Sequence, residues 1–238
     1  MLGLGHGVQA DTVSLAEIFS NKYSLAFNGT DECVTINQVG DDMTPENKGT
    51  ISIWAIMNVT TPSQNIIRAQ ADSDNQIFIF WHNSSDTIRF NLKSRGTVAS
   101  VQYDASSFDH SAWTHFAMTW ENGGNIHAYI NGSEVGEGAA YPDEAFEGSI
   151  DTVYLGQNAA NGAYFKGQMD EVSIWTEVMS ISELYNARTH RDVEFSGLDN
   201  TQLVGYWRME EGTGTSTTDE SGKGNNGTLV NTPTWTAY

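Results

Sequence analysis

Short segments in which apolar and polar residues alternate, separated by Gly and Asn, fill this sequence from Tyr23 to Trp175. In the segment 114–120, Phe116, Met118 and Trp120 fall at every second position, which is the period of a strand with one buried face. Because strand-like segments follow one another without helices between them, we expect a β-sandwich or barrel rather than alternating strand–helix–strand units.

Turn and cap residues mark where these elements end. Asn131-Gly132 lies between two strand-like segments, and this dipeptide predicts a two-residue type I′ hairpin. Ser180 and Glu183 have the spacing of a capping box before an apolar stripe, which predicts one short helix after Trp175. The later segment 203–212 again has the pattern of a strand, so we expect the C-terminal part to return to the same sandwich.

The first residues differ in composition from the rest of the chain. The opening is rich in Gly, and Ser14 to Glu17 has capping-box spacing before a short apolar face. We therefore divide the chain into an N-terminal docking arm, 1–21, and one sandwich domain, 22–238. The arm residues expected to contact a neighbouring protein are Leu2, Leu4, Leu15, Ile18 and Phe19.

Charge and cysteine content exclude several classes of partner. Thirty acidic residues against 11 Lys and Arg give a formal net charge of −19, which disfavours nucleic acid and anionic membranes. The single cysteine, Cys33, permits no internal disulfide, and its alternating context predicts a buried side chain. No segment has the length of a membrane span, and the start lacks the pattern of a signal peptide. We expect synthesis and assembly in a cytosol.

Four segments in order, WTHFAMTW, GNIHAYINGSEV, VYLGQ and YFKGQMDEVSIWTEVMSISELYNA, resemble the laminin-G-like and pentraxin jelly rolls of the concanavalin A-like lectin/glucanase superfamily. DNQIFIFWHN and YWRMEEGTGTSTTDESGKGNNGTL add to this resemblance, which extends over residues 23–235. It implies an all-β fold, a single jelly-roll β-sandwich of two antiparallel sheets with one short helix. It implies little about function, because this fold carries many activities.

The MLGLG start joined to one such module, with its LVGYWRM segment, is similar to structural proteins of bacteriophages. This second resemblance implies a non-enzymatic virion component, a head decoration, fibre or adhesion subunit, assembled in the host cytoplasm. Its partners would be other virion proteins or copies of itself, together with cell-surface carbohydrate. The alternatives are a free carbohydrate-binding lectin module, assisted by calcium, and a glucanase-like glycoside hydrolase.

Oxygen-bearing side chains before one strand raise the question of calcium. Asp72, Asp74 and Asn75 cluster there, and Asp74 and Asn75 match an Asp-Asn pair that supplies calcium ligands in pentraxins. The loop after LGQ would add Asn158 or Asn161. That loop carries amides and no carboxylates, so the resemblance implies at most a single-ion site. The alternative, favoured by turn chemistry, is that these residues cap turns. The oxygen-rich loop 219–227 lacks the spacing of an EF-hand.

Aromatic residues in Gly-rich loops are candidates for stacking on a sugar ring. Tyr141, Tyr164 and Phe165 have this context, and the alternative is that they fold back over the edge of the sandwich. The tryptophans in strand-like segments are expected in the core: Trp54, Trp81, Trp113, Trp120, Trp175 and Trp207.

Glycoside hydrolysis requires two carboxylates on either side of the scissile bond. Asp170 and Glu171 are adjacent in one strand-like segment, so their side chains should point to opposite faces. Glu210 and Glu211 are adjacent in the same way. The sequence has no HExxH or G-x-S-x-G motif either. We therefore predict that the protein is not an enzyme.

Overall fold

The computed structural model describes most of the chain after the first 20 residues. The residues described are 21–37, 39, 48–59, 62–141, 146–160, 162–186 and 200–238. The predicted arm contacts, Leu2, Leu4, Leu15, Ile18 and Phe19, lie outside these residues.

Within these ranges the chain folds almost wholly into short strands. The strands are β1 (Tyr23–Asn28), β2 (Cys33–Asn37), β3 (Lys48–Met57), β4 (Gln64–Gln70), β5 (Gln76–His82), β6 (Thr87–Ser94), β7 (Thr97–Asp104), β8 (Thr114–Glu121), β9 (Asn125–Ile130), β10 (Ser133–Ala140), β11 (Thr152–Leu155), β12 (Lys166–Trp175), β13 (Leu203–Trp207), β14 (Ser216–Thr217), β15 (Gly227–Val230) and β16 (Thr234–Ala237). The helical elements are the short helix α2 (Ile181–Asn186) and one 3₁₀ turn, η1 (Asn200–Gln202).

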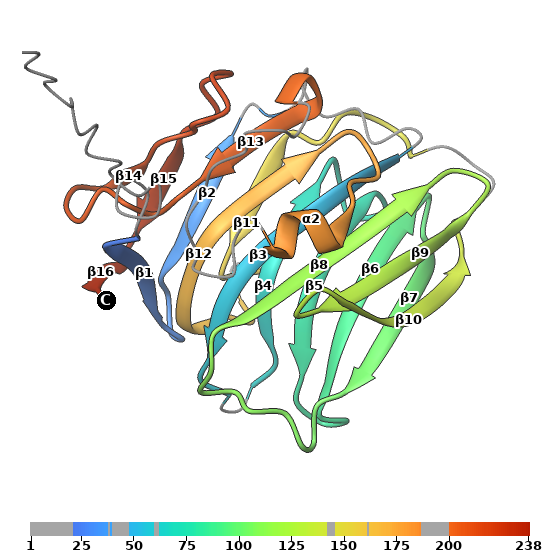
Figure 1. Cartoon of the computed structure of the whole chain (residues 1–238), viewed down its shortest axis with the longest axis horizontal. Coiled ribbons are helices and arrows are strands. Elements are labelled where there is room, and N and C mark those ends of the chain that lie inside the picture. The colour runs from blue at the N-terminus through green and yellow to red at the C-terminus, as the bar shows by residue number, and fades with distance from the viewer. Residues whose placement is uncertain are drawn as a thin grey trace, which may run out of the picture.

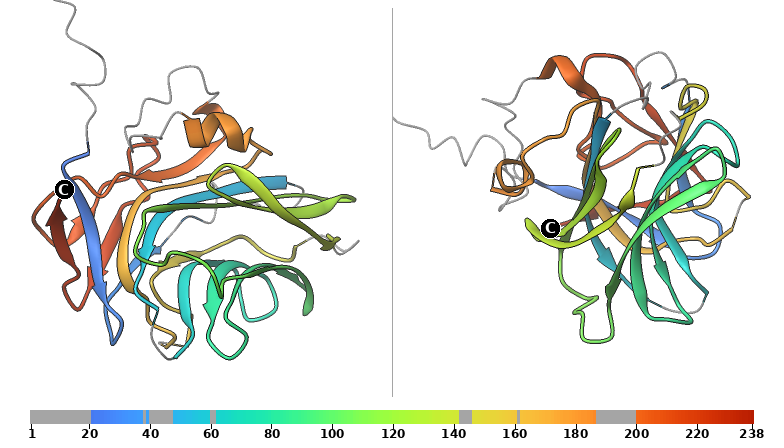
Figure 2. Two further views of the ribbon diagram at one scale, coloured as in Figure 1. Left: turned by 60° about the horizontal axis from the view of Figure 1, so that its bottom comes forward. Right: turned by 90° about the vertical axis from the view of Figure 1, so that its right-hand side faces the viewer.

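The strands form two antiparallel sheets that pack face to face (Figures 1 and 2). Sheet A has the order β10-β9-β8-β3-β12-β1-β16, with β13 also paired to β12, and sheet B has the order β14-β15-β2-β11-β4-β5-β6-β7. This is the predicted jelly-roll sandwich of two antiparallel sheets. Helix α2 lies across the outward face of sheet A, on the side toward the viewer in Figure 1.

The core between the sheets contains the residues that the two-residue period selected. Phe116, Met118 and Trp120 of β8 all belong to the main buried cluster, as the alternation predicts. Cys33 is also buried. Of the six tryptophans expected in the core, all but the partly exposed Trp113 are buried.

The predicted turn and helix are both present. Asn131 and Gly132 have φ angles of 50° and 75°, the left-handed values that a type I′ turn requires, and they join β9 to β10. Helix α2 begins at Ile181, and Ile181 and Leu184 are buried with Trp175 in a second apolar cluster outside sheet A.

The C-terminal segment returns to the sandwich, as the strand pattern after residue 203 predicts. β13 pairs with β12, β15 with β2 and β16 with β1, so both sheets contain C-terminal strands. In the part of the chain described, no helix has the length and apolar character needed to cross a bilayer.

Candidate functional site

The outward face of sheet B carries aromatic and basic side chains on neighbouring strands. Ile77 and Ile79 of β5 point into the core, so Phe78 and Phe80 between them point outward, and both are partly exposed. Arg68 of β4 is paired in register with Phe78, and Arg89 of β6 with Phe80. We call Arg68, Phe78, Phe80 and Arg89 the arginine–aromatic strip.

The members of this strip lie close to one another. The guanidinium carbon of Arg68 lies 4.0 Å from the centre of the Phe78 ring, and the two phenyl rings are 5.6 Å apart. The guanidinium carbon of Arg89 lies 5.9 Å from the centre of Phe80. Cation–π attraction of this kind stabilises a guanidinium over an aromatic ring.

Arg68 is partly buried, and its hydrogen-bond partners among the described residues are neutral. Its Nη1 donates to Oε1 of Gln76 and its Nη2 donates to Oδ1 of Asn65 over 3.1 Å. Its Nε is buried without a hydrogen-bond partner, and so is Oε1 of Gln70. Burial lowers the pKa of Arg68 to about 10, which still leaves it charged at neutral pH.

An open pocket of about 320 Å³ adjoins Arg68 at the end of β4 and β5. It is lined by Arg68, Gln70, Ser73, Gln76 and the segment 158–160. The Asn158 side chain shapes this segment, because its Oδ1 accepts hydrogen bonds from the amides of residues 160 and 162 over 3.1 and 2.9 Å. The pocket thus presents several hydrogen-bonding groups and one cation.

The predicted calcium ligands are used within turns. Asp72 accepts the amides of Asp74 and Asn75 over 2.7 and 2.9 Å, and the first of these bonds lowers the pKa of Asp72. Oδ1 of Asn75 accepts the amides of Arg95 and Glu147, both over 3.1 Å. These are the contacts that the turn-capping alternative predicts.

The remaining predicted ligands have internal partners as well. Asp74 accepts a hydrogen bond from Lys93 over 2.9 Å, and Asn158 orders its own loop as described above. In the loop 219–227, Asp219 accepts the amides of Ser221 and Asn225, both over 2.9 Å. Among the residues that the structure describes, no group of three or more His, Cys, Asp or Glu side chains could hold a metal ion.

Two of the three predicted sugar-stacking residues are buried, so that prediction is wrong for them. Tyr141 is 1% exposed and Phe165 is 0% exposed. The amide of Phe165 donates to the carbonyl of Gly156 over 2.8 Å, and its ring meets Phe27 edge to face at 5.9 Å. The loop therefore turns this ring into the core. Tyr164 stays partly exposed.

The expectation that Asp170 and Glu171 point to opposite faces is also wrong. Met169 and Val172 both belong to the main core, and the register of β12 shifts between Asp170 and Ser173. Glu171 has a φ of 53° at this bulge. The extra residue interrupts the alternation, so both acids lie on the outward side of sheet A.

Both of these acids are fully buried. Asp170 accepts hydrogen bonds from Nδ2 of Asn21 over 2.8 Å and from the Tyr238 hydroxyl over 2.5 Å. Glu171 accepts one from the Tyr206 hydroxyl over 2.5 Å. Burial, and then the charge of Glu171, raise the pKa of Asp170 well above its usual value. Two enclosed carboxyl groups cannot flank a glycosidic bond, so they belong to the packing of sheet A.

Comparison with known proteins agrees with the fold. A family model described as the concanavalin A-like lectin/glucanases superfamily, of laminin G type, matches residues 28–184. The chain therefore belongs to this family of lectin-like jelly rolls. A search of curated protein sequences finds no match to the chain.

Solved structures give the same fold at low sequence identity. A protein of Bacteroides ovatus, described as a proposed carbohydrate-binding protein, has a TM-score of 0.67 at 16% identity, over 92% of this chain and 60% of its own. CBM40 of the Ruminococcus gnavus IT-sialidase, bound to α2,3-sialyllactose, has a TM-score of 0.54 at 14% identity, over 71% of this chain and 98% of its own. Domains LG4-5 of the mouse laminin α1 chain have a TM-score of 0.52 at 12% identity, over 65% of this chain and 42% of that one.

Proposed function

We propose that this protein is a non-enzymatic carbohydrate-binding module whose ligand occupies the pocket beside Arg68. The observation that carries the proposal is the combination of an open, hydrogen-bonding pocket with the partly exposed arginine–aromatic strip next to it. Sugars offer hydroxyl groups at their edges and C–H groups on their faces, so such sites combine polar groups with aromatic surface. The carbohydrate-binding descriptions of two structurally similar proteins support the same function.

The test is to fill the pocket. Residue Ala160 lines it and is exposed, so Ala160→Trp adds bulk there without entering the core. We expect the unchanged chain to bind a subset of sugars on a glycan array and Ala160→Trp to lose that binding. Ser106→Trp, at an exposed position beyond the end of β7, is the matched control and should bind like the unchanged chain. An empty array, or equal binding by Ala160→Trp, would contradict the proposal.

A role in a virion stays a prediction from the sequence. It rests on the arm 1–21 and on a resemblance to bacteriophage structural proteins, and the arm residues lie outside the described part of the chain. Deletion of residues 1–20, which keeps Asn21 and its hydrogen bond to Asp170, should abolish incorporation into particles while leaving glycan binding intact. Incorporation of the shortened chain at the normal level would contradict the docking role of the arm.

A further inference from the structure

The Lys and Arg side chains of the described residues differ in whether they form ion pairs with carboxylates. Lys48 meets Glu177 at 2.6 Å and Lys93 meets Asp74 at 2.9 Å. In the part of the chain described, neither Arg68 nor Arg89 has an ion pair with a carboxylate, although the whole chain carries a net charge of −19. The outward face of sheet B therefore carries two guanidinium groups that have no carboxylate partner among the described residues.

Of the two arginines, Arg68 has the positive charge that its surroundings compensate less. A cation taken partly out of water is costly unless an opposite charge or several hydrogen bonds replace the lost hydration. Arg68 has the neutral amides of Gln76 and Asn65, the face of Phe78, and a buried Nε with no partner. A ligand carboxylate in the adjoining pocket would supply the missing counter-charge.

The pocket itself contributes no competing acid. Its side chains are those of Arg68, Gln70, Ser73, Gln76 and Asn158, together with two alanines. The nearby carboxylates are engaged elsewhere, because Asp72 accepts hydrogen bonds of its own turn and Asp74 pairs with Lys93. An anion entering the pocket therefore meets one positive charge and neutral donors.

The strip extends this positive surface beyond the pocket. Arg89 lies two strands from Arg68 and two residues further along, which corresponds to roughly 12 Å for ordinary strand spacing and rise. Phe80 lies opposite Arg89 in the sheet, and a guanidinium covers its ring less closely than it covers Phe78, at 5.9 Å against 4.0 Å. Arg89 donates hydrogen bonds to the hydroxyls of Thr87 and Ser85, which fixes its direction without neutralising it.

Resting on the proposed function, we infer that the ligand is an acidic glycan, with one sugar carboxylate at Arg68, a second at Arg89 and the intervening sugar over Phe80. This names the class of sugar, uronic or sialic acid, and assigns the specificity to the two arginines. The planar fork of arginine suits a carboxylate, because it offers two parallel N–H donors.

The test uses matched probes that differ only in charge. Trigalacturonate and its methyl ester share one skeleton, and 3′-sialyllactose and its methyl ester form a second pair. By titration calorimetry with the full chain, we expect at least one acidic probe to bind about tenfold or more tighter than its neutral partner, a difference of about 1.4 kcal/mol. Added salt should weaken the acidic probe only.

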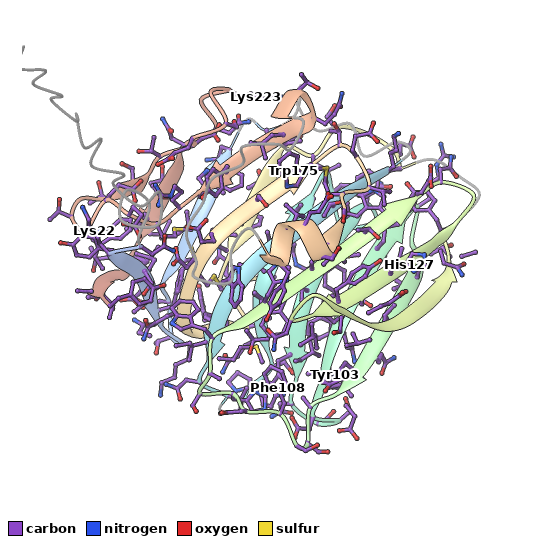
Figure 3. The ribbon with its side chains drawn as sticks, in the orientation of Figure 1. Lys22, Tyr103, Phe108, His127, Trp175 and Lys223 are labelled. Carbon is purple, nitrogen blue, oxygen red and sulfur yellow. The ribbon has the colours of Figure 1, made fainter. Side chains whose placement is uncertain are left out.

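Variants then assign the preference to residues. Arg68→Gln should remove most of it, Arg68→Lys should retain part of it, and Arg89→Gln should weaken binding of trigalacturonate more than of sialyllactose. Lys223→Gln, in the loop between β14 and β15 (Figure 3), is the control and should change nothing. Thermal unfolding of each variant checks that it is folded, and Arg89→Gln keeps the test valid if Arg68→Gln does not fold.

The outcomes separate the two claims. Equal affinity for the acidic and neutral probes, or a preference that survives both Arg68→Gln and Arg89→Gln, would overturn the acidic-glycan inference and leave the proposed function standing. If only neutral sugars bind on the glycan array, the inference fails in the same way. If no sugar binds at all, the proposed function fails and the inference fails with it.

Discussion

The outward faces of the two sheets both carry polar and charged side chains, which are buried on sheet A and partly exposed on sheet B. On sheet A, Ser52, His115, Asp170 and Glu171 are each 0% exposed. On sheet B, the arginine–aromatic strip is only partly buried and adjoins an open pocket. The comparison shows that residue chemistry alone does not identify a site, because cover by the rest of the chain decides which groups can meet a ligand.

Sheet A illustrates the effect of cover. Ser52 Oγ and His115 Nε2 are 2.7 Å apart, a distance that would suit a nucleophile and its base. However, Tyr185 of helix α2 lies over them, with its ring 5.7 Å from His115 and stacked on Trp54 at 5.7 Å. Because no substrate can reach the pair, we assign it to the attachment of α2 to the sheet.

Truncation of one large side chain on each face should give the largest contrast. Trp175, labelled in Figure 3, is fully buried in the cluster under α2, so Trp175→Ala should cost about 3–5 kcal/mol in the free energy of unfolding. Phe78→Ala on sheet B should cost only about 1 kcal/mol, because the ring is partly exposed. Denaturant unfolding of both variants measures the difference. Equal losses would contradict the contrast between the faces.

A glycine in each sheet offers the next test. A Cβ on Gly167 of β12, at a φ of 148°, would lie 2.0 Å from the carbonyl oxygen of Ile56, so Gly167→Ala should cost about 3 kcal/mol or more. Gly96, at the β6–β7 turn of sheet B, has a φ of 83° but space around its Cβ position, and Gly96→Ala should cost about 1–2 kcal/mol. Thermal unfolding distinguishes them, and a smaller loss at Gly167 would show that β12 tolerates displacement.

The buried acids of sheet A should give a pH dependence that the sheet B face lacks. Because the folded-state pKa of Asp170 is raised by burial, its contribution is fully present below the unfolded pKa and is lost as pH rises through the folded value. Asp170→Asn removes this titration. The unchanged chain should therefore lose stability relative to Asp170→Asn as the pH increases above about 4, measured by urea unfolding at several pH values. Parallel curves would mean that folding does not shift the pKa of Asp170.

Of the changes considered, the addition of calcium should have the smallest effect on stability. The oxygens of Asp72, Asn75 and Asn158 already accept backbone amides, so added calcium should shift the melting temperature by less than about 1 °C. Differential scanning fluorimetry with calcium and with EDTA measures this. A clear stabilisation that is lost in Asp74→Ala would show that the loop reorganises around an ion.

Much of the fold could be predicted from the sequence because strand alternation and turn residues are local signals. The dipeptide Asn131-Gly132 predicted the hairpin between β9 and β10. The two-residue period predicted the buried face of β8 that contains Phe116, Met118 and Trp120. The bulge at Glu171 could not be predicted, because it arises from pairing with strands distant in sequence. Loop closure by Phe165 depends on a long-range fit in the same way.

The candidate site was harder to predict from the sequence than the fold. In the segment 77–81, IFIFW, every residue is apolar, so the pattern does not say which alternate set faces the core. Phe78 and Phe80 were therefore missed as surface residues. Their alternation with Ile77 and Ile79 indicated only that one face of this strand is aromatic and the other aliphatic. The position of Arg68 beside them depends on the pairing of β4 with β5, which the sequence alone did not provide.

On this account the ligand binds the open face of sheet B. Backbone amide signals followed by NMR, while an array-selected glycan is added to the unchanged chain, locate the bound sugar. We expect the shifts to concentrate at Arg68, Gln76, Phe80 and the segment 158–160, with little change at Ser52 or His115. Shifts that concentrate on the outward face of sheet A, and leave β4 and β5 unchanged, would contradict it.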